Sequence, residues 1–327
     1  MRQPRIKFPA TEGDATYHCI SRTVNGEWLF TEADKDMLRR QLWQVADYCG
    51  VQVITYCVLS NHFHILVRVP KQQPVSDREL LRRYRVLYPA PSPFQSANLK
   101  AIEADLERGG PEADNWRRRH VALMGDVSQY MKLLKQRFSI WFNKSHARFG
   151  TLWAERFKSL LVESDSRALQ NVAAYIDLNS VRAGLATDPK DYRFCGYAEA
   201  VAGNDLAQGG IRSAIGKQNW SDTQAAYRML LFGTGAGPRE SATVAPSELE
   251  KVLEEGGRLP ITTVLRCRLR YFTDGAVLGS RIFVEAQISK YHQRCGRRGG
   301  SKPRPLPPVA DWGDLTALRG FRLRSIG

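Results

Sequence analysis

The sequence predicts an α+β fold, in which an antiparallel sheet carries helices packed on one face. Two apolar runs, VQVITYCVL and HFHILVRV, are separated only by Ser60 and Asn61 and are typical of a β-hairpin. A strand-like run and a helical pattern come before the hairpin, and a helix, a strand and another helix come after it. Strands and helices in this order indicate a sheet-and-helix sandwich.

The elements before the hairpin have clear boundary signals. The β-rich run ATYHCISRT is the first predicted strand, and the Asn25–Gly26 pair after it is a turn signal. A helix is predicted next, because Thr31 and Asp34 have the spacing of a capping box. Its apolar positions recur at helical spacing as far as Gly50: Leu38, Leu42, Val45, Ala46 and Cys49.

Two more helices and a strand are predicted after the hairpin. Residues 71–117 are charged and contain several prolines, so they are interpreted as an insertion with some helix. Apolar residues repeat at i, i+3, i+4 and i+7 over about 126–143 and predict an amphipathic helix. The segment TLWAERFKSLLVES ends like a strand, and a helix over about 166–183 follows it and stops at Gly184.

The chain beyond about residue 205 has a different composition and predicts a mostly helical C-terminal appendage. Glycine-rich stretches such as GTGAGP and EEGGRLP separate short helical pieces there. Residues 267–291 are compatible with a helix-turn-helix, although simple packing of two small helices explains them equally well. The segment GRRGGSKPRPLPP resembles a flexible basic tail. The expected organisation is therefore one domain at 1–200 and a helical region at 205–327.

Composition and charge direct attention to nucleic acid. The formal net charge of the 327 residues is +15, and such an excess of Lys and Arg attracts polyanions, although a solvated basic surface without a partner is the alternative. The six cysteines include no C-x-x-C pair, which argues against a zinc ribbon and a disulfide framework. We find neither a long apolar span nor a secretory signal pattern, and expect a cytoplasmic, nucleoid-associated protein.

The predicted strand after Asn61 contains two histidines at alternate positions. His62 and His64 project from the same face, because residues i and i+2 of a strand do so, while Phe63 projects from the other. Such a pair can offer two imidazole nitrogens to one divalent ion. Two half-exposed strand histidines without a ligand are the alternative. A ligand site requires this face of the hairpin to stay partly open.

The helix at about 166–183 offers the groups that two histidines lack. Tyr175 and Asn179 lie one turn apart at the edge of its apolar stripe. Asn179 can supply a carbonyl oxygen to a metal ion, and Tyr175 can supply a phenolate nucleophile beside it. Taken alone, Tyr175 is also explained as an amphipathic packing residue. Tyr130 is a rival nucleophile, but core packing on the stripe of its own helix explains it better.

Several motifs together resemble a known family, the IS200/IS605-type Y1 transposases of the HUH single-strand nuclease superfamily, and within it the REP-associated tyrosine transposases. The motifs are YHCISRTVNGEWLF, LSNHFHILV, LKQRFSIWFNK, GTLWAERFKS and AAYIDLNSVRAGL followed by DYRFCGY, and they span about residues 14–200. The resemblance implies a Y1 transposase domain built as a small α+β fold with a central antiparallel sheet. One departure is Ser180, which stands where the family's motif has Pro.

The resemblance also implies the roles of the site residues. His62 and His64 are expected to bind the divalent metal, Asn179 to help hold it, and Tyr175 to be the single catalytic tyrosine. A phenol has a pKa of about 10, so a neighbouring cation is needed to favour the phenolate at neutral pH. Imidazole ligands alone favour Zn, Cu or Ni, but cellular availability and the phosphate ligand favour Mg²⁺ or Mn²⁺. A homodimer is expected, as is usual in the family.

Basic and aromatic residues alternate from 132 to 158, a mixture suited to holding a nucleic-acid backbone. The residues expected to contact phosphate are Lys135, Arg137, Arg156 and Lys158. Trp141 and Trp153 are interpreted as structural. The leading hypothesis is a metal-dependent transposase that binds single-stranded or hairpin DNA and cuts it through a 5′-phosphotyrosine intermediate. Two alternatives are a domesticated DNA-binding protein without transposition and a phosphodiesterase that uses water.

Overall fold

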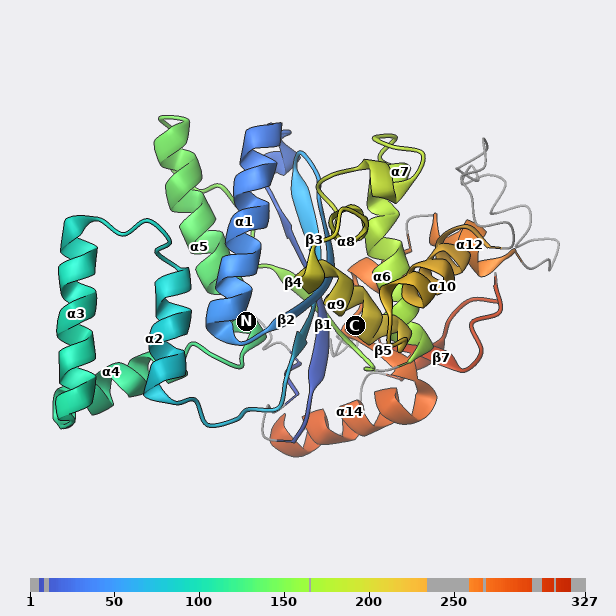
Figure 1. The fold of residues 1–327 in the computed structure, drawn as a ribbon. Coiled ribbons are helices and arrows are strands. Elements are labelled where there is room, and N and C mark those ends of the chain that lie inside the picture. Colours follow the sequence, from blue (N-terminus) through green and yellow to red (C-terminus); the bar gives the residue numbers. More distant parts are fainter. Residues whose placement is uncertain are drawn as a thin grey trace, which may run out of the picture.

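One sheet runs through the centre of the protein in the computed structural model and joins strands from both ends of the chain (Figure 1). The structure describes residues 6–8, 12–164, 166–233, 259–266, 269–295, 302–308 and 310–318. Within these ranges the sheet has seven strands in the order β2-β3-β1-β4-β5-β7-β6. The strands are β1 (Ala15–Arg22), β2 (Gln52–Val58), β3 (His62–Val69), β4 (Lys158–Val162), β5 (Val277–Ser280), β6 (Arg304–Pro305) and β7 (Leu315–Leu318).

The sheet is mostly antiparallel, which confirms the α+β class. Strand β1 pairs antiparallel with both β3 and β4, and β2 pairs antiparallel with β3, so the predicted hairpin is present. Strand β7 is antiparallel to both β5 and β6. The parallel pair is β4 with β5, which joins the N-terminal strands to the C-terminal ones.

Helices lie on both faces of the sheet rather than on one (Figure 1). Helices α1 (Glu32–Cys49) and α5 (Val127–Ser145) cover one face, and α6 (Arg167–Asp177) and α9 (Asp205–Ile215) cover the other. The reason lies in the central strands, whose side chains are buried on both faces over most of their length. In β3, Phe63 and Ile65 on one face are fully buried, and so is Leu66 on the other. Each face therefore requires a cover.

Two of the helices that cover the sheet have well-formed caps. The Thr31 side chain accepts a hydrogen bond from the Asp34 backbone, and the Asp34 side chain accepts one from the Thr31 backbone, which confirms the capping box of α1. Gly50 ends this helix with φ of 64°, a left-handed conformation that glycine adopts without strain. Helix α6 begins after Ser166, whose side chain accepts from the Leu169 backbone.

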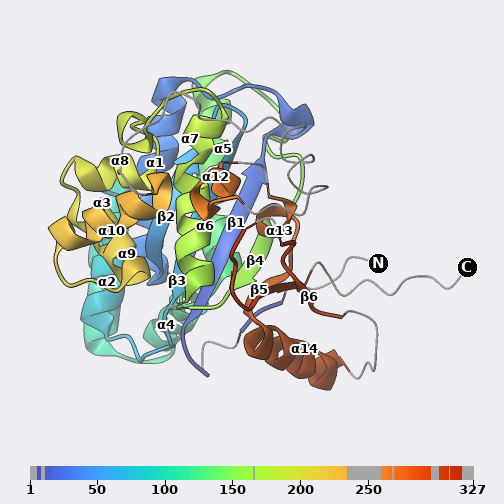
Figure 2. The same cartoon turned by 90° about the vertical axis from the view of Figure 1, so that its right-hand side faces the viewer.

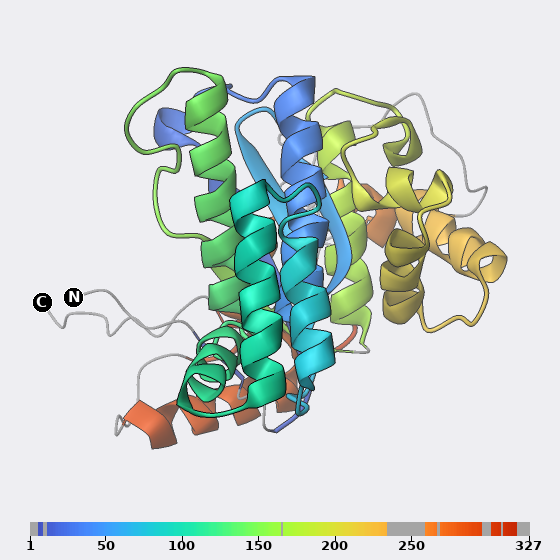
Figure 3. The ribbon, with the colours of Figure 1, turned by 60° about the vertical axis from the view of Figure 1, so that its left-hand side comes forward.

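The segment expected to be an insertion forms three helices beside α1 (Figure 3). They are α2 (Asp77–Val86), α3 (Pro93–Arg108) and α4 (Pro111–Val121). Helix α2 packs on α1 through the fully buried Leu80 and through an ion pair between Arg82 and Asp47. The 71–117 segment is therefore more helical than its prolines and charges indicate.

The region beyond about residue 205 is mostly helical, as expected, but it also contributes β5, β6 and β7 to the central sheet. The helices described after α6 are α7 (Asn179–Arg182), α8 (Gly196–Val201), α9, α10 (Trp220–Phe232), α12 (Ile261–Leu265), α13 (Arg270–Thr273) and α14 (Arg281–Cys295). A short 3-10 helix at Pro189–Asp191 lies between α7 and α8, and another at Val24–Gly26 follows β1. The division into domains at 1–200 and 205–327 stays a prediction. Across the described ranges, we find no helix that combines the length and apolarity needed to span a membrane.

The helix-turn-helix alternative for 267–291 does not fit the structure. Strand β5 lies between α13 and α14, because Val277 and Leu278 are fully buried and pair with Leu161 and Val162 of β4. Figure 2 shows α13 beside β1 and β4. The predicted basic tail lies partly outside the described residues. Within its described part, Arg304–Pro305 form the edge strand β6.

Candidate active site

The candidate site begins with three histidines on one face of the sheet. In the antiparallel register of β1 and β3, Ile20 lies opposite His64 and Arg22 lies opposite His62. Since side chains alternate along a strand, His18 of β1 projects from the same face. The ring centroids of His62 and His64 are 5.2 Å apart, and those of His18 and His64 are 5.1 Å apart. The structure therefore brings the two predicted ligands together and adds a third imidazole.

The two inner histidines are buried and hydrogen-bonded in a row. His18 Nε2 lies 2.8 Å from His64 Nδ1, and His18 Nδ1 lies 2.8 Å from the carbonyl oxygen of Phe272. Burial lowers the pKa of His18 to about 3 and places the pKa of His64 well below its ordinary value. Both imidazoles are therefore neutral near pH 7, which is the form that binds a metal ion.

His62 is half-buried at the outer end of this row. Its Nδ1 lies 2.6 Å from Asn61 Oδ1, and Asn61 Nδ2 donates to the carbonyl oxygen of Gly26. Because the amide NH₂ is directed to Gly26, the oxygen faces His62, and the imidazole Nδ1 is the donor. In the neutral form of His62, Nε2 is then the unprotonated nitrogen, and it is the atom that a metal ion would use.

Tyr175 faces the histidines from α6. Its ring centroid lies 6.3 Å from that of His64 and 6.4 Å from that of His18, in edge-to-face geometry. The helix places it there because its apolar stripe, which includes Val172 and Ile176, packs onto the sheet. The predicted nucleophile and the predicted ligands thus come from two elements that face each other across the core.

Tyr175 is covered by residues from two further segments, so only 1% of its surface is exposed. The guanidinium carbon of Arg182 lies 3.9 Å from the centre of the phenol ring, and the Phe272 ring lies 5.1 Å from it. Arg182 also donates to the carbonyl oxygens of Tyr175 and Leu265. The histidine face expected to stay partly open is therefore covered at His18 and His64, because C-terminal residues pack over it, and His62 remains half-buried.

Asn179 closes the end of α6. Its Nδ2 lies 3.1 Å from the Tyr175 carbonyl oxygen and 3.0 Å from that of Ile176, and the side chain is buried. Ser180, at the position where the motif has Pro, donates its hydroxyl to the Asp177 carbonyl oxygen. The amide nitrogen of Asn179 thus stabilises the helix end, and its expected role as a metal ligand stays a prediction.

The four basic residues predicted to contact phosphate differ in their surroundings. Lys135 donates to the Glu155 carbonyl oxygen and lies over the Trp153 ring. Arg137 donates to the Leu87 carbonyl oxygen. Both therefore have structural contacts within the protein.

The other two basic residues are more exposed. Lys158 lies 3.6 Å from Asp274, and Arg156 is exposed two residues before it. The phosphate-contacting role of all four residues stays a prediction. Arg156 and Lys158 are the pair best placed to test it, since their side chains reach the surface beside β4.

Two residues of the site were not predicted from the sequence. His18 sits within a predicted strand, but its position beside His64 depends on the pairing of β1 with β3, which no local pattern reveals. Arg182 carries a readable signal, because it follows Tyr175 by seven residues and such spacing places two side chains on one face of a helix. Arg182 brings a permanent positive charge to the phenol.

The side chains of the site supply only some of the ligands that a divalent ion needs. In the ranges that the structure describes, no group of three or more His, Cys, Asp or Glu side chains is arranged to hold a metal. The two imidazoles of His62 and His64 can supply two nitrogen ligands, and a third ligand has to come from an amide, the DNA phosphate or water. His62 and His64 therefore supply two of the ligands that a divalent ion needs, and the DNA phosphate or water would supply others.

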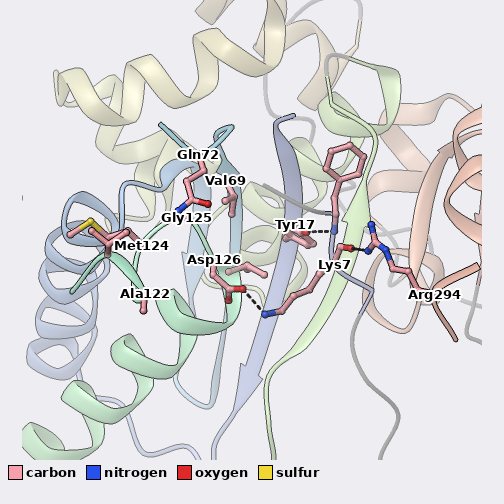
Figure 4. A pocket seen from close by; sticks show the side chains of 12 residues that line it. Lys7, Tyr17, Val69, Gln72, Ala122, Met124, Gly125, Asp126 and Arg294 are labelled. Atoms are coloured by element: carbon pink, nitrogen blue, oxygen red, sulfur yellow. Dashed lines mark hydrogen bonds and ion pairs between the residues drawn. The ribbon is translucent and has the colours of Figure 1, made fainter. Parts of the chain in front are cut away.

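A pocket of about 400 Å³ lies away from this site (Figure 4). Its polar groups are largely paired with one another: Lys7 with Asp126 at 2.5 Å, and Arg294 with the Lys7 carbonyl oxygen. Tyr17, which also lines it, projects from β1 opposite to His18, and burial raises its pKa to about 12. The pocket thus lies across the sheet from the three histidines.

Comparison with known proteins gives a family match for the first part of the chain. Residues 12–78 match the family described as transposase IS200 like, and they form β1, α1, β2 and β3. No curated protein matches the chain. A solved structure titled "Structure of the REP associates tyrosine transposase bound to a REP hairpin" is 13% identical, covers 63% of this chain and 90% of that chain, and has a TM-score of 0.37. Similarity at that level carries no conclusion.

The matched segment contains His18, Asn61, His62 and His64, whereas Tyr175 lies beyond it. The facing geometry described above is what connects Tyr175 to the matched part. The family match confirms the resemblance to the IS200-like transposases, and it covers residues 12–78.

Proposed function

We propose that this protein is a metal-dependent single-strand DNA nuclease and strand transferase that cuts hairpin or repeat DNA. The observation that carries the proposal is the approach of Tyr175 to His64, with 6.3 Å between ring centroids, from an element outside the family match. The formal net charge of +15 supports a nucleic-acid substrate.

The proposed step is a transesterification. The Oη of Tyr175 attacks the phosphorus of a phosphodiester, the bond from phosphorus to the 3′ oxygen breaks, and a 5′-phosphotyrosine forms. The phenol proton passes to solvent, and the leaving 3′ oxygen takes up a proton. The reverse attack by another 3′-OH rejoins strands without an external energy source.

The groups around Tyr175 have separate tasks in this step. Arg182, whose guanidinium lies over the phenol ring, brings a positive charge to the proposed nucleophile. His62 and His64 would hold Mg²⁺ or Mn²⁺, which would supply positive charge to the phosphate. The neutral, buried state of His64 is the state that such a ligand needs.

A DNA-binding protein that does not cut is the second candidate, and one observation favours it. Tyr175 is only 1% exposed and lies beneath Phe272, so a phosphodiester reaches it only after the cover has moved. A protein that keeps this cover in the presence of DNA would bind without forming an adduct.

Replacing Tyr175 by phenylalanine is expected to abolish a covalent protein–DNA adduct and to leave DNA binding within a few-fold of wild type. The measurement is incubation with labelled single-stranded DNA from hairpin-forming sequences that flank the gene, with Mn²⁺, Mg²⁺ or EDTA. The adduct is detected by denaturing electrophoresis. His64→Ala is expected to remove the metal-dependent adduct as well, because it removes a ligand.

Tyr130→Phe is the matched control for this experiment. Tyr130 is also a fully buried helical tyrosine, but its hydroxyl faces the Leu42 carbonyl oxygen within the α1–α5 layer. Its adduct yield is expected to equal that of wild type. Binding without an adduct under every metal condition would favour the DNA-binding protein, and cleavage that persists in Tyr175→Phe would point to hydrolysis by water.

Removing the exposed cations beside β4 is expected to weaken DNA binding without changing sequence preference. For each of Arg156→Gln and Lys158→Gln we expect the slope of log affinity against log salt to fall by about 0.7, the value for one single-strand phosphate contact. Fluorescence anisotropy at several salt concentrations measures it. Arg108→Gln, an exposed arginine on α3, is the control, and a slope unchanged from wild type in all three variants would contradict the prediction.

A further inference from the structure

His18 connects a proposed metal ligand to the C-terminal region through its two ring nitrogens. Its Nδ1 is 2.8 Å from the Phe272 carbonyl oxygen, and its Nε2 is 2.8 Å from His64 Nδ1. The partners come from three places in the chain, because His18 is on β1, His64 on β3 and Phe272 on α13. The contact between His18 and Phe272 joins residues 254 apart in the sequence.

The first hydrogen bond has only one possible direction. A carbonyl oxygen accepts and never donates, so His18 Nδ1 must carry the proton in its contact with Phe272. His18 is fully buried, and the charged side chain that acts on it is the cation Arg182. A second ring proton would place a positive charge in this buried site, which is costly. His18 is therefore neutral, and its Nε2 is an acceptor.

The second hydrogen bond then follows from the first. Because His18 Nε2 accepts, His64 Nδ1 must donate to it, so His64 Nδ1 carries the proton. In a neutral imidazole the other nitrogen is then unprotonated, and the lone pair lies on His64 Nε2. His62 reaches the same tautomer by a different route, through Asn61 Oδ1.

We propose that His18 is a positioning residue that holds His64 in the tautomer with a proton on Nδ1 and a lone pair on Nε2, and thereby sets the affinity for a divalent ion. The proposal rests on the proposed function for the identity of the ligand, but the tautomer is a property of the protein alone. We call the two hydrogen bonds, from His64 to His18 and from His18 to the Phe272 carbonyl oxygen, the histidine relay. Because the relay ends on this carbonyl oxygen, the C-terminal region takes part in the site through its backbone. Partners of this kind commonly change metal affinity by about 10–100-fold.

Two substitutions at His18 distinguish the effect of its hydrogen bonds from the effect of its packing. His18→Phe keeps a flat ring of similar size and removes both polar contacts. His18→Gln can restore them, because its amide nitrogen donates to the Phe272 carbonyl oxygen while its amide oxygen accepts from His64 Nδ1. A purely structural role for His18 predicts that Phe is tolerated at least as well as Gln, whereas the relay predicts the opposite order.

The test combines a spectroscopic measurement with a binding measurement on the full chain. Long-range ¹H–¹⁵N correlation spectra of histidine-labelled protein without metal report the tautomer of His64, assigned by its loss in His64→Ala. Titration with Mn²⁺, followed by electron paramagnetic resonance, reports metal affinity. We expect wild type and His18→Gln to show the Nδ1-protonated tautomer and affinities within a few-fold of each other. We expect His18→Phe to show a mixture of tautomers and to bind Mn²⁺ about 10–100-fold more weakly.

The outcomes that overturn this inference differ from the outcome that contradicts the proposed function. An Nε2-protonated His64 in the wild type, no binding of Mn²⁺ by the wild type, or equal Mn²⁺ affinity in wild type and His18→Phe would overturn the inference. A wild type that shows the expected tautomer and the expected order of Mn²⁺ affinities but forms no adduct with DNA would support the inference and contradict the proposed function.

Discussion

Replacing Phe272 by alanine is expected to lower the free energy of unfolding by about 3–5 kcal/mol, the usual loss for a buried phenylalanine. Phe272 is fully buried, and its ring lies edge-to-face with those of Tyr175 and Trp312, with centroid distances of 5.1 and 6.2 Å. The substitution leaves a cavity where the C-terminal region meets α6. Urea unfolding followed by circular dichroism measures the change.

Phe94→Ala is the matched control, because Phe94 has an exposed fraction of 82% and its loss is expected to cost less than about 0.5 kcal/mol. If Phe272→Ala costs no more than this control, the cover over Tyr175 does not form in solution. When wild type and Phe272→Ala are compared at equal concentrations of folded protein, the variant is also expected to form the DNA adduct faster, because it lacks the ring that shields the Tyr175 phenol.

The stability difference between the wild type and Asp177→Asn is expected to fall by about 4 kcal/mol from pH 4 to pH 7 and then to level off. Asp177 is fully buried, where it accepts hydrogen bonds from Thr55, from Tyr227 and from the Tyr197 backbone. Burial, opposed by these hydrogen bonds, raises its pKa to about 7.

The sign follows from the protons bound in each state. Between about pH 4 and pH 7 the folded protein keeps the proton on Asp177 while the unfolded chain, with a pKa of about 3.9, has lost it. The folded state therefore binds more protons, and stability decreases as the pH rises, by about 1.4 kcal/mol per unit. The Asn variant has no such proton, so the difference between the two proteins isolates this effect.

Urea unfolding of both proteins at half-unit steps of pH measures the difference. Tyr227→Phe removes one hydrogen-bond donor from the Asp177 carboxylate and is expected to raise the pKa of Asp177 further. The pH at which the stability difference levels off should therefore be higher in this variant. Parallel stability curves for the wild type and Asp177→Asn would show that Asp177 is ionised in the fold throughout this range.

The sequence predicted the elements whose signals are local. Thr31 and Asp34 marked the start of α1, and the short link at Ser60 and Asn61 marked the hairpin. The strands of the C-terminal region were missed because β5 has four residues and its partner β4 lies far away in the chain. Local patterns contain no information about such a pairing.

The site was predictable where it depends on spacing along one element. His62 and His64 share a face of β3, and Tyr175 lies on the buried side of α6, as alternation and helical periodicity require. The position of His18 beside His64 depends on strand register. The burial of Tyr175 depends on Phe272, and a residue that reaches the site from the far end of the chain has no signature within its own segment.

The separation of 254 residues between His18 and Phe272 also has a consequence in time. Ribosomes add roughly 5–20 residues per second, so about 13–50 seconds pass between the addition of His18 and that of Phe272. Once residue 175 has been added, the chain contains His62, His64 and Tyr175, but the Phe272 carbonyl oxygen that ends the histidine row and the Phe272 ring that covers the phenol do not yet exist. A nascent chain still attached to its ribosome therefore lacks the cover over the proposed nucleophile, and the histidine row is completed only when translation has passed α13.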